Sequence, residues 1–334
     1  MKQVTVLSAG TWGITLATLL AAKGEPVRVW EYDPAVVREL TTNHLHPKLP
    51  GMEIPHDLPI TTDMGEALAG SEAIVCVVPA AHVRQTCRAV AEVGYHGQLF
   101  IICSKGIEQG THALLADVCR EELGPAAEGR IGVLSGPSHA EEVSRGIPTA
   151  VTAAAADLGT AEAIRDLFMT PRFRIYTQVD LRGVELGGAL KNVVAIACGI
   201  SDGLGFGDNS KAALITRGLS EIVRLSVALG AQAETFMGLA GLGDLVVTGM
   251  SPHSRNWKFG HLVGQGYSPD AALAAVGMVV EGHYTVRAAL DLAAEQGVSM
   301  PITEAVGKVI FEGLAPLAAV ESMMGRDPKS ELEG

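Results

Sequence analysis

The sequence predicts an α/β protein in which a doubly wound, mostly parallel sheet is followed by an all-α C-terminal domain. In the first half, short β-branched runs alternate with helix-like segments, as in parallel strands joined by right-handed crossovers. From about residue 180 onward the apolar stretches have helical length and no convincing strand follows. The length of 334 residues also suits two domains.

The strands are expected in the β-branched apolar runs of the first half. These runs are 4–9, 27–32, 73–79, 99–104, 131–136, 149–155 and 173–178. Helix-like segments such as 11–24 and 111–124 separate them, whereas 183–200 and 212–230 are long apolar helical stretches. We therefore expect a first domain over 1–178 and a helical domain over 179–334.

Composition narrows the choice of partners and compartment. The formal net charge of −12 argues against nucleic acid and against anionic membranes. Five cysteines without a CxxC pair favour a reducing cytoplasm. The N-terminus lacks a signal-peptide layout, and no uninterrupted apolar stretch predicts a membrane span.

The turn Ser8–Gly13, between the first strand and the first helix, is typical of a Rossmann-like dinucleotide site. Gly10 would let the backbone approach a pyrophosphate, and Gly13 would let the helix pack closely on the strand. Ser8 stands where the first glycine of such a turn usually lies, and is tolerable there if it needs only a negative φ. The alternative is an ordinary strand-turn-helix.

Glu31 ends the second strand, where an acidic side chain is placed to accept hydrogen bonds from the adenosine ribose. Its charge would repel a 2′-phosphate, so it favours NAD over NADP. A solvated strand end is the alternative interpretation. Asp33, followed by a proline, reads as a helix N-cap.

Three positions place charge in apolar surroundings: Lys105 at the end of a predicted strand, Lys191 beside Asn192 in a helix of small residues, and Asp244. A desolvated lysine has a lowered pKa and suits general acid/base work beside a carbonyl. The alternative for Lys191 is a side chain that reaches solvent.

Further anion-binding candidates lie later in the chain. Ser254, Arg255 and Asn256 are consecutive donors that suit a phosphate or carboxylate; a helix N-cap with a surface arginine is the alternative. The Gly-Pro turn within 134–143 could hold an oxyanion or the nicotinamide side. The histidines show no metal-ligand spacing, so no metal is expected.

Together these residues resemble the bacterial type of NAD(P)-dependent glycerol-3-phosphate dehydrogenase, from about residue 3 to 325. The matching stretches are AGTWGITLA, CSKGIE, LSGPSHAEEV, ELGGALKNVVAIACGISDGLGFGDN, ALITRGL, TFMGLAGLGDLVVT, SRNWKFG, VVEG and MPITEAV. Each is modest alone, but their order and spacing are specific.

The resemblance implies a reversible reduction of dihydroxyacetone phosphate to sn-glycerol 3-phosphate that supplies phospholipid synthesis, carried out by a homodimer. It implies that Lys191 donates the proton to the carbonyl oxygen and acts as base in the reverse direction. Lys105 is expected to hold and polarise the substrate, and Asp244 to order that network.

The resemblance also implies the binding residues. Cofactor contacts are expected at Gly10, Thr11, Trp12, Gly13, Glu31, Lys105, Ala140, Arg255, Val279 and Glu281. Substrate contacts are expected at Lys105, Gly136, Ser138, Lys191, Asn192, Asp244, Thr248, Ser254, Arg255 and Asn256.

The chain departs from the family pattern at three positions. Ser8 replaces the first glycine of the turn, and Gly249 stands where a cysteine is common. Glu31 stands where many bacterial members carry a basic or neutral residue, which favours NAD while leaving NADP possible.

Two other functions remain open on this sequence. Another dehydrogenase of the β-hydroxyacid or 6-phosphogluconate type would share the architecture but need a carboxylate site in place of the phosphate site. A non-catalytic regulator that senses NAD(H) would need no proton donor, and Lys191 argues against it.

Overall fold

The computed structural model describes residues 3–328, 330 and 331. The described residues form two compact units. The first unit comprises 1–104 and 113–181, and the helical unit comprises 105–112 and 182–334. The units are therefore not simply consecutive along the chain, because the short segment after Ser104 belongs with the helical unit.

The first unit is built on an eight-stranded sheet with the order β3-β2-β1-β4-β5-β6-β7-β8. All neighbouring strands run parallel except β6 and β7, which are antiparallel. The strands are β1 Val4–Leu7, β2 Val27–Trp30, β3 Ile60–Thr61, β4 Ala73–Cys76, β5 Leu99–Ile102, β6 Ile131–Ser135, β7 Thr149–Ala155 and β8 Phe173–Gln178. The predicted mostly parallel, doubly wound sheet is confirmed.

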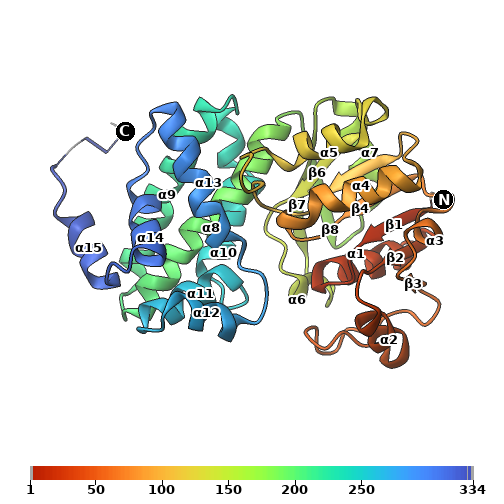
Figure 1. Cartoon of the computed structure of the whole chain (residues 1–334), viewed down its shortest axis with the longest axis horizontal. Coiled ribbons are helices and arrows are strands. Elements are labelled where there is room, and N and C mark those ends of the chain that lie inside the picture. Colours follow the sequence, from red (N-terminus) through yellow and green to blue (C-terminus); the bar gives the residue numbers. More distant parts are fainter. Residues whose placement is uncertain (1–2, 329, 332–334) are drawn as a thin grey trace. The chain divides into compact units, whose positions relative to one another are not determined.

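Two groups of helices cover the sheet (Figure 1). In one group α6 and α7 pack against α1, and in the other α3 and α5 pack against α4. The helices of this unit are α1 Thr11–Ala22, α2 Pro34–Asn43, α3 Met64–Leu68, α4 Val83–Gly94, α5 Leu115–Leu123, α6 Ala140–Val143 and α7 Leu158–Phe168. Since both faces are covered, the central strands are buried along their whole length.

Each of the seven predicted strand runs contains a strand, and β3 was missed. With two residues it is too short to show any periodicity. Its neighbour in the sheet is β2, to which it pairs through Val29–Ile60 and Trp30–Thr61. The alternation also could not reveal that β7 runs antiparallel to β6.

The helical unit contains no strand among its described residues, as expected. Its helices are α8 Leu181–Gly203, α9 Asp208–Ala228, α10 Asp244–Met250, α11 Arg255–Gly264, α12 Pro269–Val276, α13 Glu281–Gln296, α14 Pro301–Phe311 and α15 Pro316–Met324. Among the described helices, only α8 is long and apolar enough to cross a membrane, and its most apolar stretch is entirely buried inside the protein.

Small residues let α8 and α11 approach each other closely. A Cβ on Gly199 would lie 2.1 Å from the carbonyl oxygen of Trp257, and a Cβ on Gly260 would lie 2.1 Å from that of Ile196. Real Cβ atoms do not approach so closely, so both positions require glycine. This contact fixes α8, which carries Lys191, against the helix that begins at Arg255.

Candidate active site and cofactor loop

The loop between β1 and α1 depends on Gly13. A Cβ on Gly13 would lie 2.0 Å from the carbonyl oxygen of Ser8, so any side chain there would force the loop to move. A Cβ on Gly10 would meet only the Ser8 hydroxyl, at 3.7 Å. Gly13 is therefore needed for packing, whereas Gly10 leaves the backbone open to a ligand.

Ser8 has a φ of +97°. The condition on which serine would be tolerable here, a negative φ, is therefore not met. Positive φ is uncommon outside glycine because the Cβ crowds the backbone. The structure thus holds a strained serine where glycine would be relaxed.

The N-terminus of α1 is suited to an anion. Its N-cap residue is Gly10, which has no side chain to cap the helix, and the first turn carries no acidic residue. Backbone N–H groups and the helix dipole at such an end favour phosphate. The strand order around β1 is also that of dinucleotide-binding sheets. These residues fit a dinucleotide.

Glu31 is 4% exposed and follows β2 directly. Its Oε2 accepts a hydrogen bond from the Ala9 backbone at 2.7 Å, and its Oε1 accepts one from the Asp33 backbone at 3.2 Å. The carboxylate is thus fixed beside the loop that would hold the cofactor. Asp33 caps α2 through the Ala35 backbone, as predicted.

In the helical unit, Lys105, Lys191 and Asp244 meet. Asp244 Oδ1 lies 2.5 Å from Lys191 Nζ, and its Oδ2 lies 2.6 Å from Lys105 Nζ. The Asp244 side chain is 2% exposed, the Lys191 side chain 7%, and the Lys105 side chain 21%. The three charges singled out in the sequence therefore form one cluster, although 139 positions separate Lys105 from Asp244.

The cluster has unusual electrostatics. Burial and the nearby charge of Lys105 lower the pKa of Lys191 to about 7, although Asp244 opposes this shift. Burial alone would raise the pKa of the Asp244 carboxyl, but the two lysines outweigh it and the net shift is downward. At neutral pH, Asp244 is thus ionised and Lys191 can exchange a proton.

Thr248 completes the surroundings of Lys191. Its Oγ1 accepts a hydrogen bond from Lys191 Nζ at 2.6 Å and donates to Asp244 Oδ1 at 3.3 Å. Residues four apart lie on one face of a helix, so the spacing of Asp244 and Thr248 in α10 was a signal for this contact. Without the resemblance to the dehydrogenase family, the sequence pattern did not predict a role for Thr248.

The side chains of Asn192 and Asn256 are hydrogen-bonded to each other. Asn256 Nδ2 donates to Asn192 Oδ1 at 2.9 Å, and its Oδ1 accepts from the Gly282 backbone at 2.8 Å. Asn192 Nδ2 donates to the Gly188 backbone at 3.3 Å. This series of hydrogen bonds connects α8, α11 and the start of α13, next to Lys191.

The side chains of the three donors at 254–256 have different surroundings. Ser254 is buried and caps α11 by accepting a hydrogen bond from the Trp257 backbone. Arg255 is exposed at the first position of the helix, and Asn256 is buried against α8. The N-cap interpretation of Ser254 is correct, and Arg255 is the member of the run that presents a charge at the surface.

The remaining expected contacts lie in both units. In the first unit, Gly136 has a φ of +145° and accepts a hydrogen bond from the Ser138 hydroxyl at 3.0 Å, while Trp12 packs on Phe173. Other members are Thr11, the first residue of α1; Ala140, the first residue of α6; Val279, which is 38% exposed; and Glu281, the first residue of α13. None of the described residues gather as three or more metal-ligating side chains.

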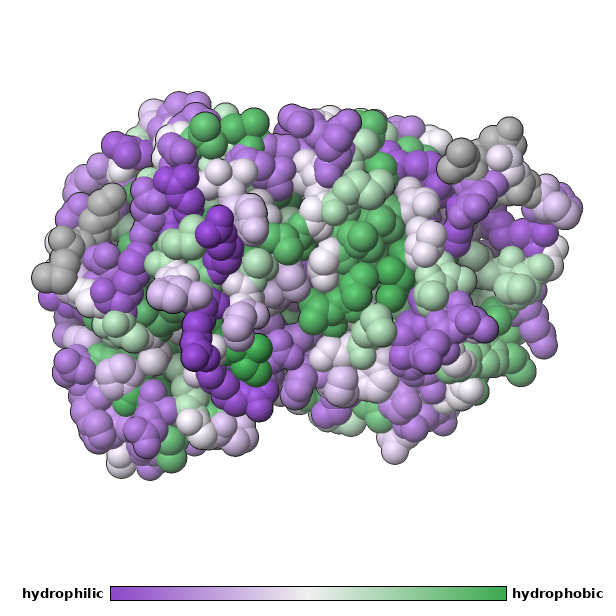
Figure 2. Space-filling view, turned by 180° about the vertical axis from the view of Figure 1, so that it is seen from behind, coloured by the Kyte–Doolittle hydropathy of each residue, from purple (hydrophilic) through white to green (hydrophobic). Residues whose placement is uncertain are grey.

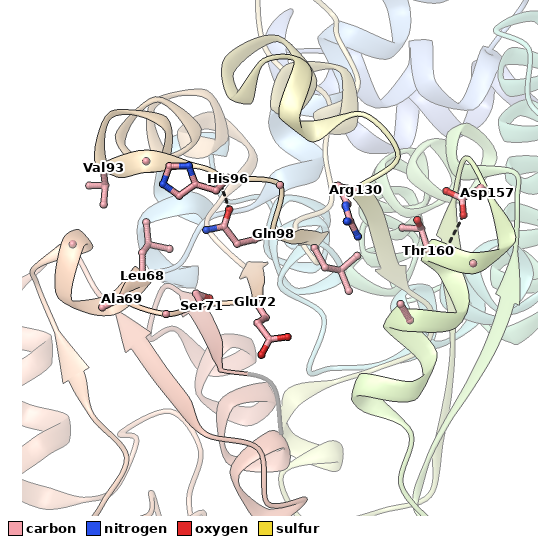
Figure 3. A pocket seen from close by; sticks show the side chains of 17 residues that line it. Leu68, Ala69, Ser71, Glu72, Val93, His96, Gln98, Arg130, Asp157 and Thr160 are labelled. Atoms are coloured by element: carbon pink, nitrogen blue, oxygen red, sulfur yellow. Dashed lines mark hydrogen bonds between the residues drawn. The ribbon is translucent and has the colours of Figure 1, made fainter.

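A hollow of about 840 Å³ lies at the amino ends of the central strands, whereas the β1–α1 loop follows the carboxyl end of β1 (Figure 3). Glu72, Gln98 and Arg130 line it, and they stand at the amino ends of β4, β5 and β6. Dinucleotides bind at the carboxyl ends of such strands. Figure 3 shows two hydrogen bonds in its rim that are local, one from the His96 backbone to Gln98 and one from the Thr160 backbone to Asp157.

Two family models match the chain. The N-terminal model of NAD-dependent glycerol-3-phosphate dehydrogenase matches residues 3–161, and the C-terminal model matches residues 180–321.

Individual relatives carry related names. A protein of Geobacillus thermodenitrificans named glycerol-3-phosphate dehydrogenase [NAD(P)+] is 48% identical, over 99% of this chain and 97% of its own length. One from Halalkalibacterium halodurans with the same name is 47% identical, over 100% and 96%. The crystal structure of glycerol-3-phosphate dehydrogenase from Coxiella burnetii superposes with a TM-score of 0.92 at 37% identity, covering 97% of this chain and 99% of that one.

Proposed function

Since the chain belongs to the NAD-dependent glycerol-3-phosphate dehydrogenase family, we propose that it interconverts dihydroxyacetone phosphate and sn-glycerol 3-phosphate. It is an NAD(P)-dependent glycerol-3-phosphate dehydrogenase, an oxidoreductase. Our proposal extends this to the reaction and to the residues that carry it out. The ketone is reduced reversibly, and Lys191 supplies the proton.

The buried contact between Lys191 and Asp244 carries this proposal. A ketone gains a hydride at carbon and a proton at oxygen, and a bound nicotinamide would supply the hydride. Lys191 is the proton donor because its pKa of about 7 lets it hold a proton at neutral pH and release it to a developing alkoxide. In the reverse direction neutral Lys191 takes the hydroxyl proton.

Lys105 and Asp244 act on the same atoms. Asp244 holds both ammonium groups through separate oxygens, so it fixes their positions relative to the carbonyl oxygen. Thr248 accepts a second hydrogen bond from Lys191 and limits its rotation. Lys105 adds positive charge where the oxygen becomes negative, which lowers the barrier to reduction.

The phosphate of the substrate is proposed to bind Arg255 and Asn256, with Gly136 and Ser138 as further substrate contacts. A guanidinium matches two phosphate oxygens at once. Holding this remote group would orient the carbonyl at the lysines and save entropy in the reaction. Asn256 is supported in its position by Asn192 and by the Gly282 backbone.

The cofactor is proposed to be NAD(H) in preference to NADP(H). The pyrophosphate would lie on the open N-terminus of α1 at Gly10 to Gly13, and the ribose beside Glu31. A buried carboxylate there repels a 2′-phosphate and accepts hydrogen bonds from a free 2′-hydroxyl. Thr11, Trp12, Ala140, Val279 and Glu281 are proposed as further contacts.

We further propose a cytoplasmic homodimer that supplies glycerophospholipid synthesis. Apolar side chains on the surface support the dimer, and Figure 2 shows such areas among polar ones on the face it presents. The exposed apolar residues of the helical unit include Met237, Met250, Leu317 and Met324. Light scattering coupled to gel filtration measures the state directly, and a monomer at micromolar concentration would contradict the dimer.

The test of the proposed function compares substrates by the loss of NADH absorbance. Dihydroxyacetone phosphate should be reduced much faster than dihydroxyacetone, which lacks the phosphate. Oxidation of a β-hydroxyacid or of 6-phosphogluconate in preference to sn-glycerol 3-phosphate would instead support the second dehydrogenase type. NADH binding without turnover of any of these compounds would support the sensor.

A further inference from the structure

Ser8 is strained where glycine would be relaxed. Its φ of +97° is unfavourable for a residue with a Cβ. The position itself is well fixed, because the Ser8 backbone donates to the Trp30 carbonyl at 2.8 Å and its carbonyl oxygen packs against Gly13. A serine side chain in such a place calls for a compensating interaction.

The Ser8 hydroxyl lies between Glu31 and the loop. Its oxygen is 3.5 Å from Glu31 Oε2, to which it donates, and it accepts from the Gly10 backbone at 3.3 Å. Ala9, the next residue, donates to the same Glu31 oxygen at 2.7 Å. Both Ser8 and its neighbour thus face one carboxylate oxygen.

Glu31 has particular need of such donors. Its carboxylate is buried, and within the described residues it forms no ion pair. Its hydrogen-bond donors are the Ala9 and Asp33 backbones and the Ser8 hydroxyl. Desolvated carboxylates depend on each donor that remains.

We propose that Ser8 is a positioning residue that orients the Glu31 carboxylate and thereby sharpens the preference for NAD(H) over NADP(H). This inference rests on the proposed function, in which Glu31 receives the adenosine ribose. A carboxylate held by an additional donor keeps its oxygens toward the ribose hydroxyls. It also cannot rotate away to admit a 2′-phosphate.

Two variants distinguish the effect of losing the Ser8 hydroxyl from the effect of relieving the backbone strain. Ser8→Gly removes both the hydroxyl and the strain, whereas Ser8→Ala removes the hydroxyl and keeps the Cβ. The dissociation constants of NADH and NADPH are measured by fluorescence titration without substrate, and thermal unfolding is followed in parallel. Ser8→Gly is expected to fold because it matches the backbone that the loop already adopts.

Both variants are expected to reduce the NADPH-to-NADH ratio of dissociation constants by about 3- to 10-fold, the effect of losing one modest hydrogen bond. Only Ser8→Gly is expected to raise the melting temperature. In the background of Glu31→Gln, Ser8→Ala should no longer change the ratio, because the two residues act together.

Three results would overturn the inference. Equal weakening of NADH and NADPH would mean that the hydroxyl serves the pyrophosphate, which both cofactors share. An unchanged ratio in Ser8→Ala would mean that the hydroxyl does not act on Glu31. An undiminished effect of Ser8→Ala in Glu31→Gln would remove the coupling. Failure of the proposed reaction would appear separately, as wild-type enzyme that binds NADH but does not reduce dihydroxyacetone phosphate.

Discussion

Lys191 Nζ lies 2.5 Å from Asp244 Oδ1, and the other oxygen of the same carboxylate forms an ion pair with Lys105. One buried negative charge therefore serves two ammonium groups. With both lysines protonated the cluster carries an excess positive charge in a desolvated place, and release of a proton from Lys191 relieves it. This imbalance is what fits Lys191 for proton transfer.

The rate should depend on pH in opposite ways for the two directions. In the proposed mechanism reduction needs protonated Lys191, so its kcat/KM is expected to fall as the pH rises through about 7. Oxidation needs the neutral amine, so its kcat/KM is expected to rise over the same range. Initial rates in both directions between about pH 6 and pH 8.5 test this; parallel profiles would contradict it.

Asp244→Asn should cost both stability and activity. It leaves the buried Lys191 and the partly buried Lys105 without their counter-charge, which destabilises the fold by about 3 kcal/mol, as measured by urea unfolding at neutral pH. Because the folded pKa of Asp244 lies below its ordinary value of 3.8, its stabilisation is present above that pH and is lost as the pH falls through the folded value.

The matched control for Asp244→Asn is Glu121→Gln, which breaks an exposed ion pair with Arg84. Exposed pairs contribute little, so the free energy of unfolding should hardly change. Equal losses in the two variants would mean that burial of Asp244 does not matter.

Gly13→Ala and Gly10→Ala should differ in kind. The added Cβ in Gly13→Ala would meet the Ser8 carbonyl at 2.0 Å, so both the melting temperature and NADH affinity should fall. In Gly10→Ala the nearest atom is 3.7 Å away, so the fold should persist while NADH affinity falls, because the methyl group stands where the pyrophosphate approaches. Calorimetry and NADH titration distinguish these outcomes; unimpaired NADH binding in both would place the cofactor elsewhere.

Arg255→Ala should weaken the use of dihydroxyacetone phosphate, because it removes the proposed phosphate partner. We expect kcat/KM to fall by at least about 10-fold, the loss of a charge-assisted hydrogen bond. Added guanidinium should restore part of the activity. Lys258→Ala, an exposed change in the same helix, is the control. Similar effects in both variants would indicate only a general loss of surface charge.

The sequence was sufficient for the architecture because burial patterns repeat over many residues. Alternating runs predicted the sheet, and isolated charges such as Lys191 and Asp244 predicted a polar cluster. It could not give the pairing of Asp244 with both lysines, because contacts between positions 53 and 139 apart depend on tertiary packing.

Local detail was also beyond the sequence. The positive φ of Ser8 could not be predicted from its residue type, and it does not meet the condition of a negative φ under which serine would be tolerable there. Asn256, which we propose as a phosphate contact, also forms hydrogen bonds within the protein, to the Asn192 side chain and the Gly282 backbone, and these could not be predicted from its place in the motif. A polar residue in a motif does not reveal which of its partners is internal.

Reduction of dihydroxyacetone phosphate by Lys191→Ala, compared with the wild type, tests the central claim most directly. NADH oxidation should fall by about 10²- to 10⁴-fold in the variant while NADH binding is retained, because only the proton donor is lost. Lys308→Ala, which removes an exposed lysine of α14, should leave the rate unchanged. Undiminished oxidation in Lys191→Ala would contradict the assignment of this lysine as the proton donor.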